Sequence, residues 1–177
     1  MILPLLTAIC FASASLIAAC GDREEPASED GAVLLPFDTV RVRVVTRDDT
    51  LRLVVELASS PDQQQLGLMD RSRLPDSAGM LFIYPTPQPG ADGFWMFRTK
   101  IPLDIAFIDS TGVIRTIHRM EPCRATLSAG CPTYPAGARF LAALEVNAGY
   151  FARHAVRVGD RVVLADTTQR VTGAARP

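Results

Sequence analysis

Residues 103–117 read LDIAFIDSTGVIRTI, and this stretch decides the fold class. Two short apolar runs, 103–108 and 113–117, flank the turn-forming sequence Asp-Ser-Thr-Gly at 109–112. Apolar runs of this length that are bounded by turn residues are typical of strands, and two of them joined by such a turn predict a β-hairpin. The chain is therefore expected to contain short strands rather than long helices.

The same pattern continues on both sides of this hairpin. Residues 40–44 and 51–55 alternate apolar and polar side chains around a polar turn, which predicts a second hairpin with one buried face. Further strands are expected at 79–84, 94–97, 138–146 and 161–164, although the Ala and Leu content of 138–146 would also allow a helix. Many short strands separated by turns predict a mainly β fold, either a small β-sandwich or a barrel-like domain.

One short helix is expected near residues 61–69. Ser60 can cap its first turn, Pro61 suits the first helical position, and Gln63 completes a capping box with Ser60. The helix interrupts a chain that otherwise has the pattern of strands.

The N-terminal 19 residues form an apolar run without charged side chains, which ends in Ile17-Ala18-Ala19-Cys20. Small residues before a cysteine resemble the cleavage site of a bacterial lipoprotein, so residues 1–19 are predicted to be a signal peptide and Cys20 to be lipidated. A membrane-spanning helix is the alternative, but the run is short for a bilayer and contains Pro4. We expect the protein to be lipid-anchored in the cell envelope and to face the periplasm. Gly21, which is not Asp, favours the outer membrane.

The remaining chain divides by composition. Residues 20–36, rich in Pro, Ser, Gly and acidic residues, predict a flexible linker, and residues 37–166 a β-rich domain. Residues 167–177 are expected to form a polar tail. A formal net charge of −1 and scattered arginines argue against nucleic acid as a partner, because a phosphate backbone requires clustered cations. No motif indicates a cofactor.

Two cysteines remain in the predicted domain, Cys123 and Cys131. In an exported protein, two cysteines eight positions apart predict a disulfide that closes a short loop. A zinc site that adds His118 and His154 is the competing interpretation.

Several motifs resemble a bacterial and archaeal family, domain of unknown function 192. They are Gly67-Leu68-Met69-Asp70-Arg71, Gly79-Met80-Leu81-Phe82, Phe94-Trp95-Met96 with Thr99 and Asp104, Leu144-Glu145-Val146 with Gly149, and Gly159-Asp160. The spacing of Cys123, Cys131 and Tyr134 fits as well. The resemblance covers about residues 40–165 and implies a small β-sandwich, but no established activity. Arg98 stands where family members usually have Asn.

Polar residues inside apolar runs are the candidate site, because a buried charge is costly unless it is paired. Asp104 and Glu145 are two such carboxylates, and Arg71 and Arg98 are the arginines that could pair with them. Such pairs can be purely structural, or they can form the polar end of a binding pocket. The candidate pocket residues are Arg71, Trp95, Arg98, Thr99, Asp104, Tyr134 and Glu145.

Three functions follow from these candidates. The first is a binding or accessory module without enzymatic activity, whose pocket near Trp95 holds a small molecule or another envelope ligand. The second is an envelope hydrolase that uses Asp104 and Glu145 as acid and base. The third is a copper-binding protein, since thioethers and imidazoles suit Cu(I). Its ligands would come from Met69, Met80, Met96, His118 and Met120.

Overall fold

Alternating valines place the first two strands against a core, as the sequence pattern predicts. The computed structural model describes residues 37–165, in which β1 (Asp38–Val45) pairs antiparallel with β2 (Thr50–Ala58) and Val42 lies opposite Leu53. Both of these side chains are buried. The predicted signal peptide, Cys20, linker and polar tail lie outside the described residues.

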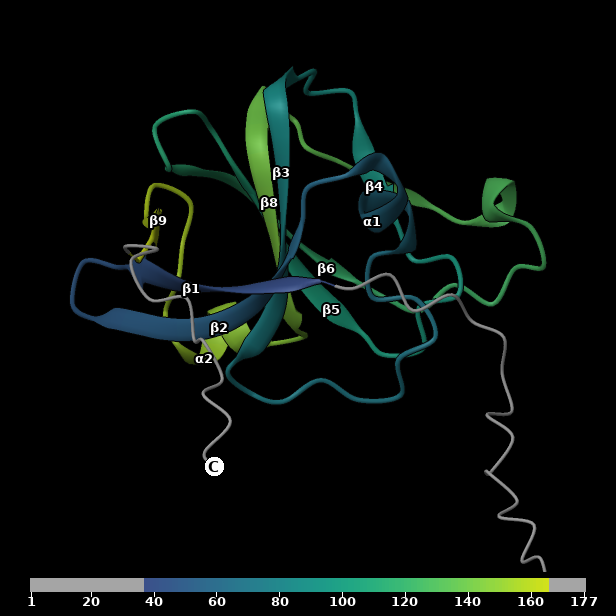
Figure 1. The fold of residues 1–177 in the computed structure, drawn as a ribbon, viewed down its shortest axis with the longest axis horizontal. Helices are drawn as coiled ribbons and strands as arrows, with labels where there is room; N and C mark the ends of the chain where they lie inside the picture. The colour runs from purple at the N-terminus through teal and green to yellow at the C-terminus, as the bar shows by residue number, and fades with distance from the viewer. Residues whose placement is uncertain (1–36, 166–177) are drawn as a thin grey trace, which may run out of the picture. The chain divides into compact units, whose positions relative to one another are not determined.

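Seven strands form one sheet in the order β6-β5-β8-β3-β2-β1-β9 (Figure 1). The neighbours β2 and β3 run parallel, and the other neighbouring pairs run antiparallel. The strands not yet given are β3 (Ala78–Gln88), β5 (Leu103–Ile108), β6 (Ile114–Met120), β8 (Phe140–Asn147) and β9 (Arg161–Leu164). The expected hairpin at 103–117 is the pair β5–β6.

The sheet curls until its two edge strands meet at one end. Val113, just before β6, forms an isolated antiparallel bridge with Arg161 of β9. The amide of Ile114 donates to the carbonyl of Asp160 at 2.8 Å, and its carbonyl accepts from the amide of Gly159 at 2.9 Å. Of the two arrangements expected from the sequence, the barrel-like one is therefore observed in residues 37–165.

A second, two-stranded sheet pairs β4 (Gly93–Trp95) with β7 (Thr133–Pro135). A 3₁₀ turn, η1 (Ser128–Gly130), precedes β7 within the loop that the disulfide between Cys123 and Cys131 closes. The short helix α2 (Tyr150–Arg153) follows β8. Figure 1 shows α2 and β4 on different sides of the central strands β3 and β8.

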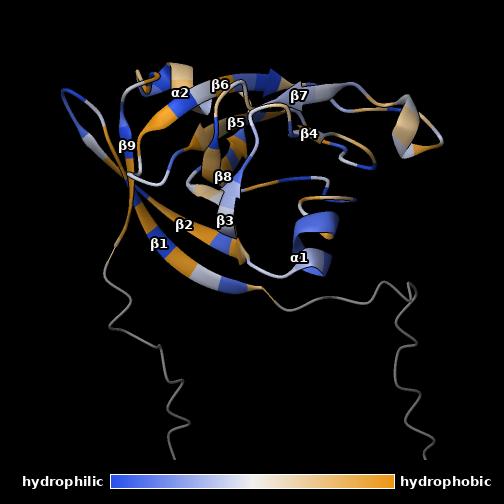
Figure 2. Ribbon diagram, turned by 90° about the horizontal axis from the view of Figure 1, so that it is seen from above, coloured by the Kyte–Doolittle hydropathy of each residue, from blue (hydrophilic) through white to orange (hydrophobic). Residues whose placement is uncertain are grey.

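Two apolar cores lie on the two faces of the sheet. The first includes Val42, Leu53 and Leu144 together with Phe151 of α2, and the second includes Met80, Phe107 and Met96. Every residue of β5 is buried, because one core covers each of its faces. This double burial explains why residues 103–108 are almost continuously apolar (Figure 2).

The helix α1 (Pro61–Leu66) lies in the connection from β2 to β3. The Ser60 side chain accepts from the Gln63 amide, and the Gln63 side chain accepts from the Ser60 amide, so the predicted capping box is present. The helix ends at Leu66, three residues earlier than expected, because Gly67 has a φ of 49° that a helix cannot continue. None of the helices in residues 37–165 is long and apolar enough to cross a membrane.

Candidate functional site

Glu145 lies near the end of β8, in the middle of the seven-stranded sheet. It is opposite Met80 of β3 and Ile105 of β5, so its side chain lies on the face that the second core covers. The residue is only 4% exposed. Burial raises the pKa of its carboxyl group from the ordinary 4.5 to about 8.

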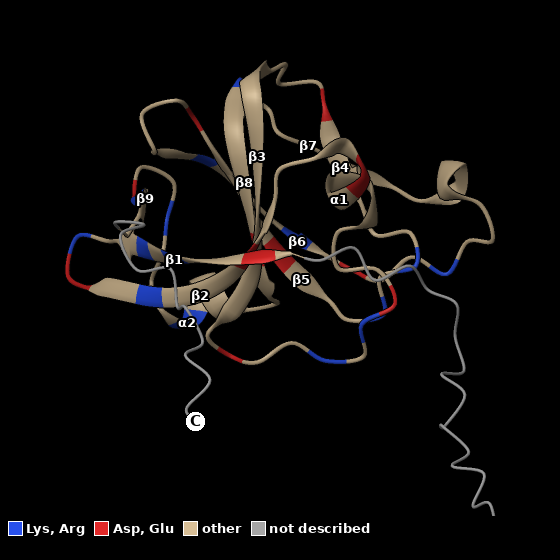
Figure 3. Ribbon diagram, viewed as in Figure 1, with Lys and Arg blue, Asp and Glu red and all other residues tan. Residues whose placement is uncertain are grey.

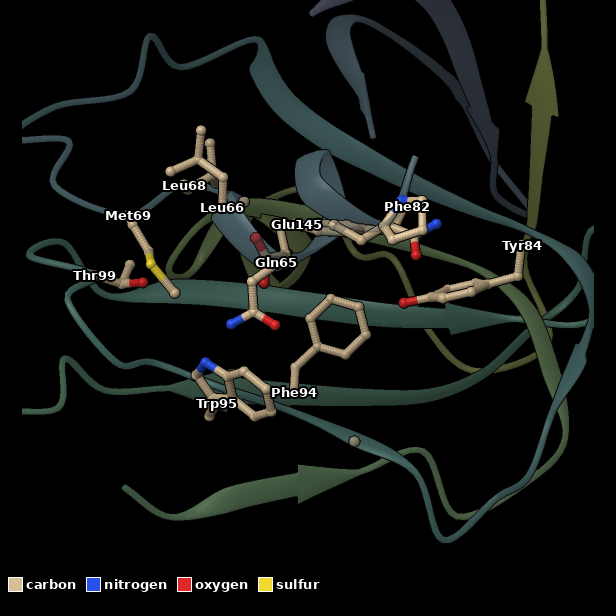
Figure 4. A pocket seen from close by; sticks show the side chains of 14 residues that line it. Gln65, Leu66, Leu68, Met69, Phe82, Tyr84, Phe94, Trp95, Thr99 and Glu145 are labelled. Atoms are coloured by element: carbon tan, nitrogen blue, oxygen red, sulfur yellow. The ribbon is translucent and has the colours of Figure 1, made fainter. Parts of the chain in front are cut away.

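A pocket of about 260 Å³ opens in front of this carboxyl group. Figure 4 shows the carboxyl of Glu145 pointing among the labelled side chains, with Met69 and Thr99 on one side of it and Phe94 and Tyr84 on the other. The principal lining side chains are Gln64, Gln65, Leu66, Leu68, Met69, Phe82, Tyr84, Phe94, Trp95, Thr99 and Glu145.

One wall of the pocket is α1 with the turn that follows it. Gln64 fixes the helix to β3 by donating from Nε2 to the carbonyl of Ile83 at 2.8 Å. At Gly67, a Cβ would come within 3.4 Å of the Phe82 ring, so the turn packs closely on β3. The positive φ at Gly67 then directs Leu68 into the second core.

The opposite wall comes from β4. Phe94 packs edge-to-face on Phe82, with ring centroids 4.8 Å apart, and the ring of Phe107 lies 5.6 Å from it. Trp95 is 39% exposed, so its indole borders the opening instead of filling the core. Gly93 allows β4 to approach β7, because a Cβ there would be 2.4 Å from the Tyr134 carbonyl.

The disulfide loop holds this wall against the domain. Cys123 is bonded to Cys131, and its amide donates to the carbonyl of Met96 at 3.3 Å, directly after β4. Met96 is completely buried in the second core. The disulfide expected from the sequence therefore supports the segment that carries Trp95.

Glu145 has no counter-ion among residues 37–165. Within residues 37–165, no group forms a hydrogen bond or an ion pair with its carboxyl, and burial is the cause of its raised pKa. The other titratable side chain that lines the pocket is that of Tyr84. Burial and the nearby charges of Glu145 and Asp92 raise the pKa of Tyr84 to about 12, so this hydroxyl stays protonated.

Comparison with known proteins assigns the family. The model of the family DUF192, described as "Uncharacterized ACR", matches residues 43–164. The chain belongs to this family. The segments that resembled it in the sequence thus belong to one structural unit, and the family match covers all of the pocket-lining residues given above.

Two solved structures resemble this DUF192 domain. A crystal structure from Sinorhizobium meliloti 1021, described as a candidate transcription regulator, is 36% identical, covers 73% of this chain and 96% of its own, and has a TM-score of 0.66. A protein of unknown function from Novosphingobium aromaticivorans is 32% identical, covers 74% of this chain and 89% of its own, and has the same TM-score. Among curated proteins, none matches the chain.

The two arginines proposed as partners of the buried carboxylates pair elsewhere in this DUF192 domain. Arg71 binds both carboxyl oxygens of Glu56, at 2.5 and 2.6 Å. Arg98 forms its ion pair with Asp70, which also lies 3.7 Å from the ammonium of Lys100. The expected pairing of Arg71 or Arg98 with Asp104 or Glu145 is therefore wrong, because acidic residues adjacent in the fold already bind both guanidinium groups.

Asp104 is buried, but it lies on the other face of the sheet from Glu145. It pairs with Val146 of β8, one position from Glu145, and successive residues of a strand point to opposite faces. Its Oδ2 accepts from the amide of Phe151 at 3.3 Å, at the start of α2. The expectation that Asp104 and Glu145 share one pocket is therefore incorrect.

The other expected pocket residues divide into two groups. Trp95 and Thr99 line the pocket with Glu145. Tyr134 does not line it: its hydroxyl accepts from the amide of Glu121 at 3.1 Å, and its ring lies 6.1 Å from that of His118. Tyr134, which belongs to β7, therefore contacts Glu121 and His118 and not the pocket.

The candidate copper ligands are mostly core residues. Met80, Met96 and Met120 are completely buried in the second core, while Met69 lines the pocket. His118 Nε2 lies 2.8 Å from the carbonyl of Pro135. Between residues 37 and 165, no group of three or more His, Cys, Asp or Glu side chains could hold a metal ion.

Tyr84, Phe94 and Gln65 also line the pocket and were not among the site residues expected from the sequence. Tyr84 could have been identified, because it follows Met80 and Phe82 at every second position of β3 and so shares their face. Gln65 had no such signal, since an exposed amide on a short helix is ordinary.

Proposed function

We propose that this chain is a lipid-anchored envelope protein whose DUF192 domain binds a small molecule in the pocket beside Trp95 and catalyses no reaction. One observation carries the binding proposal. Glu145 is a buried carboxyl without a partner among residues 37–165, and it faces a pocket that has aromatic walls. An uncompensated polar group at the end of an apolar pocket costs stability and provides specificity once a ligand contacts it.

Binding is favoured over hydrolysis because the pocket contains one carboxyl group and not two. Acid–base hydrolysis of the glycosidase type needs a pair of carboxylates across the reacting bond. The second candidate, Asp104, is on the far face of the sheet and accepts a backbone hydrogen bond there. Tyr84, protonated far above neutral pH, is a poor base.

The anchor is supported by the run Ile17-Ala18-Ala19-Cys20 and the polar segment after it. In cells fed a palmitate analogue, the wild-type chain should become labelled. A Cys20→Ala variant should lose the label and keep the unprocessed mass, while Cys10→Ala is the matched control and should label normally. Equal labelling of Cys20→Ala would contradict the anchor.

The binding function is tested by screening a fragment library that contains cations, anions and neutral compounds. Trp95 is the only tryptophan of the chain, so its emission reports on the pocket. We expect at least one fragment to change Trp95 emission and to shift the NMR signals of Thr99 and Met69. Gln65→Phe, which fills the opening from an exposed helical position, should remove both responses. A library without any hit at Trp95 would disprove the binding function.

A further inference from the structure

The pocket has one acidic side chain, Glu145, and no basic one among the described residues that line it. Among the described residues that line it, no Lys, Arg or His is present, and the titratable groups are Glu145 and Tyr84. Figure 3 shows basic residues on β1, β2 and the loops, while α1 carries an acidic residue and no basic one. A positively charged ligand would supply the ion-pair partner that the Glu145 carboxylate lacks among residues 37–165.

The walls also suit a cation. Phe82, Tyr84 and Phe94 surround the inner part of the pocket, and Trp95 borders its mouth with 39% of its surface exposed. Aromatic faces attract ammonium groups through their quadrupole, and a tryptophan is the strongest of them. Four rings and one carboxylate together form the type of enclosure that binds methylated or primary ammonium groups.

Thr99 can accept a hydrogen bond from a ligand in the pocket. The hydroxyl of Thr99 donates to the carbonyl of Phe97 at 3.5 Å, which leaves its lone pairs free to accept from a ligand N–H. A metal ion fits less well than an organic cation. Within residues 37–165 no three His, Cys, Asp or Glu side chains converge, and one carboxylate cannot supply the six to eight oxygens that Ca²⁺ takes.

The volume of the pocket limits the size of the cation. About 260 Å³ is below the range of about 300–1,000 Å³ that drug-sized ligands occupy. The pocket therefore suits a compound no larger than an amino acid or a short amine.

We infer that the pocket binds a small organic ammonium compound, whose charge is balanced by Glu145 and whose methyl or methylene groups contact Trp95 and Phe94. This inference rests on the proposed binding function and names its ligand class. Because the carboxyl must be ionised to bind a cation, binding releases a proton at neutral pH.

The test compares choline with its neutral carbon isostere, 3,3-dimethylbutan-1-ol, and adds propylammonium and propionate. Each is titrated into the purified full-length chain in maltoside detergent while Trp95 emission is followed. We expect choline or propylammonium to bind about tenfold or more tightly than the isostere and propionate. Glu145→Gln, which keeps the shape of the side chain, should remove this preference. Asp104→Asn, at the buried carboxyl on the other face, should keep it.

The pH profile provides a second measurement. Choline does not titrate, so its affinity should increase about tenfold per pH unit up to about pH 8 and then level off. Around Glu145, β3 presents Met80 and Tyr84, β5 presents Ile105, and α1 carries Asp62. Tyr84 ionises well above this interval, so the slope belongs to Glu145.

The outcomes separate the two proposals. If the isostere or propionate binds as tightly as the cations, or if Glu145→Gln leaves choline affinity unchanged, the ammonium inference is wrong while the binding function stands. If neither cation binds with a Kd below about 10 mM but a fragment without an ammonium group does, the inference is wrong in the same way. If no compound of any charge binds, the binding function itself fails.

Discussion

Glu145 is a residue whose burial opposes folding. The pKa of this carboxyl is about 8 in the folded chain, and its ordinary value is 4.5. Between these two pH values, the carboxyl is protonated in the folded chain but ionised in the unfolded chain. The folded chain therefore binds more protons between these two pH values. The stability that depends on Glu145 is fully present below about pH 4.5, is lost as the pH rises to about 8, and does not change further above that pH.

We predict that Glu145→Gln makes the protein more stable than the wild type at pH 8 and nearly equal at pH 4.5. The difference at pH 8 should be about 3–5 kcal/mol, because the glutamine has no charge to desolvate. Urea unfolding followed by circular dichroism at both pH values measures it. A wild-type chain with the same stability at both pH values would show that Glu145 is not desolvated.

Arg98 is a second residue whose conformation is unfavourable. Its φ is 57°, in the left-handed region that costs most side chains energy but that Asn adopts readily. The resemblance described from the sequence implies Asn at this position, and the positive φ gives a backbone reason why Asn would fit there better than Arg. The ion pair of Arg98 with Asp70 is exposed on both sides and compensates little.

Arg98→Asn should therefore stabilise the domain by about 0.5–1 kcal/mol, after the loss of the exposed ion pair. Thermal unfolding of wild type, Arg98→Asn and Arg98→Lys measures this. The lysine variant keeps the charge without relieving the backbone, so it should not gain stability. A gain in Arg98→Lys equal to that in Arg98→Asn would rule out backbone strain as the cause.

At the scale of elements, the hairpin β5–β6 depends on one side chain in its turn. Asp109 Oδ1 accepts from the amides of Thr111 and Val113 at 2.8 and 3.0 Å, and Oδ2 accepts from Arg115 Nε at 2.6 Å. Burial alone would raise the pKa of Asp109. The hydrogen bonds given above, together with one from the hydroxyl of Thr111, lower it by more than burial raises it, so the pKa lies below the ordinary value of 3.8. The ionised carboxylate therefore holds the turn.

Asp109→Asn should cost about 1–2 kcal/mol at pH 7, because the amide keeps one acceptor but loses the charge. The stability from Asp109 is present above its ordinary pKa and is lost as the pH falls through the lowered one, which is opposite to Glu145. Urea unfolding at pH 7 and pH 2 measures this cost, which should shrink at pH 2. A cost that is the same at both pH values would contradict the role of the charge.

For the whole molecule, the sequence predicted the elements better than their arrangement. Hairpins, the capping box and the cysteine pair follow from local rules, so 103–117, Ser60 and Cys123 were assigned correctly. The site depended on which face each strand residue occupies after pairing. Asp104 and Glu145 both lie in apolar runs, and only the register of β5 with β8 shows that they point in opposite directions. Ion pairs such as Arg71–Glu56 join distant segments, so no local pattern indicates them.

The burial of β5 between the two cores determines how its backbone amides become accessible to exchange. The strands β8, β3 and β2 form the centre of the sheet, and β5, next to β8, is buried from Leu103 to Ile108 by the two cores. Amides there can exchange only when both cores separate, so we expect the amides of Ala106 and Leu144 to exchange at the rate of global unfolding. Amides of η1 in the disulfide loop have no core contact and should exchange fastest. Hydrogen exchange measured by NMR, with and without denaturant, tests this order. If β5 exchanged through local openings while β9 stayed protected, the closing contact between Val113 and Arg161 would hold the domain together instead of the central strands.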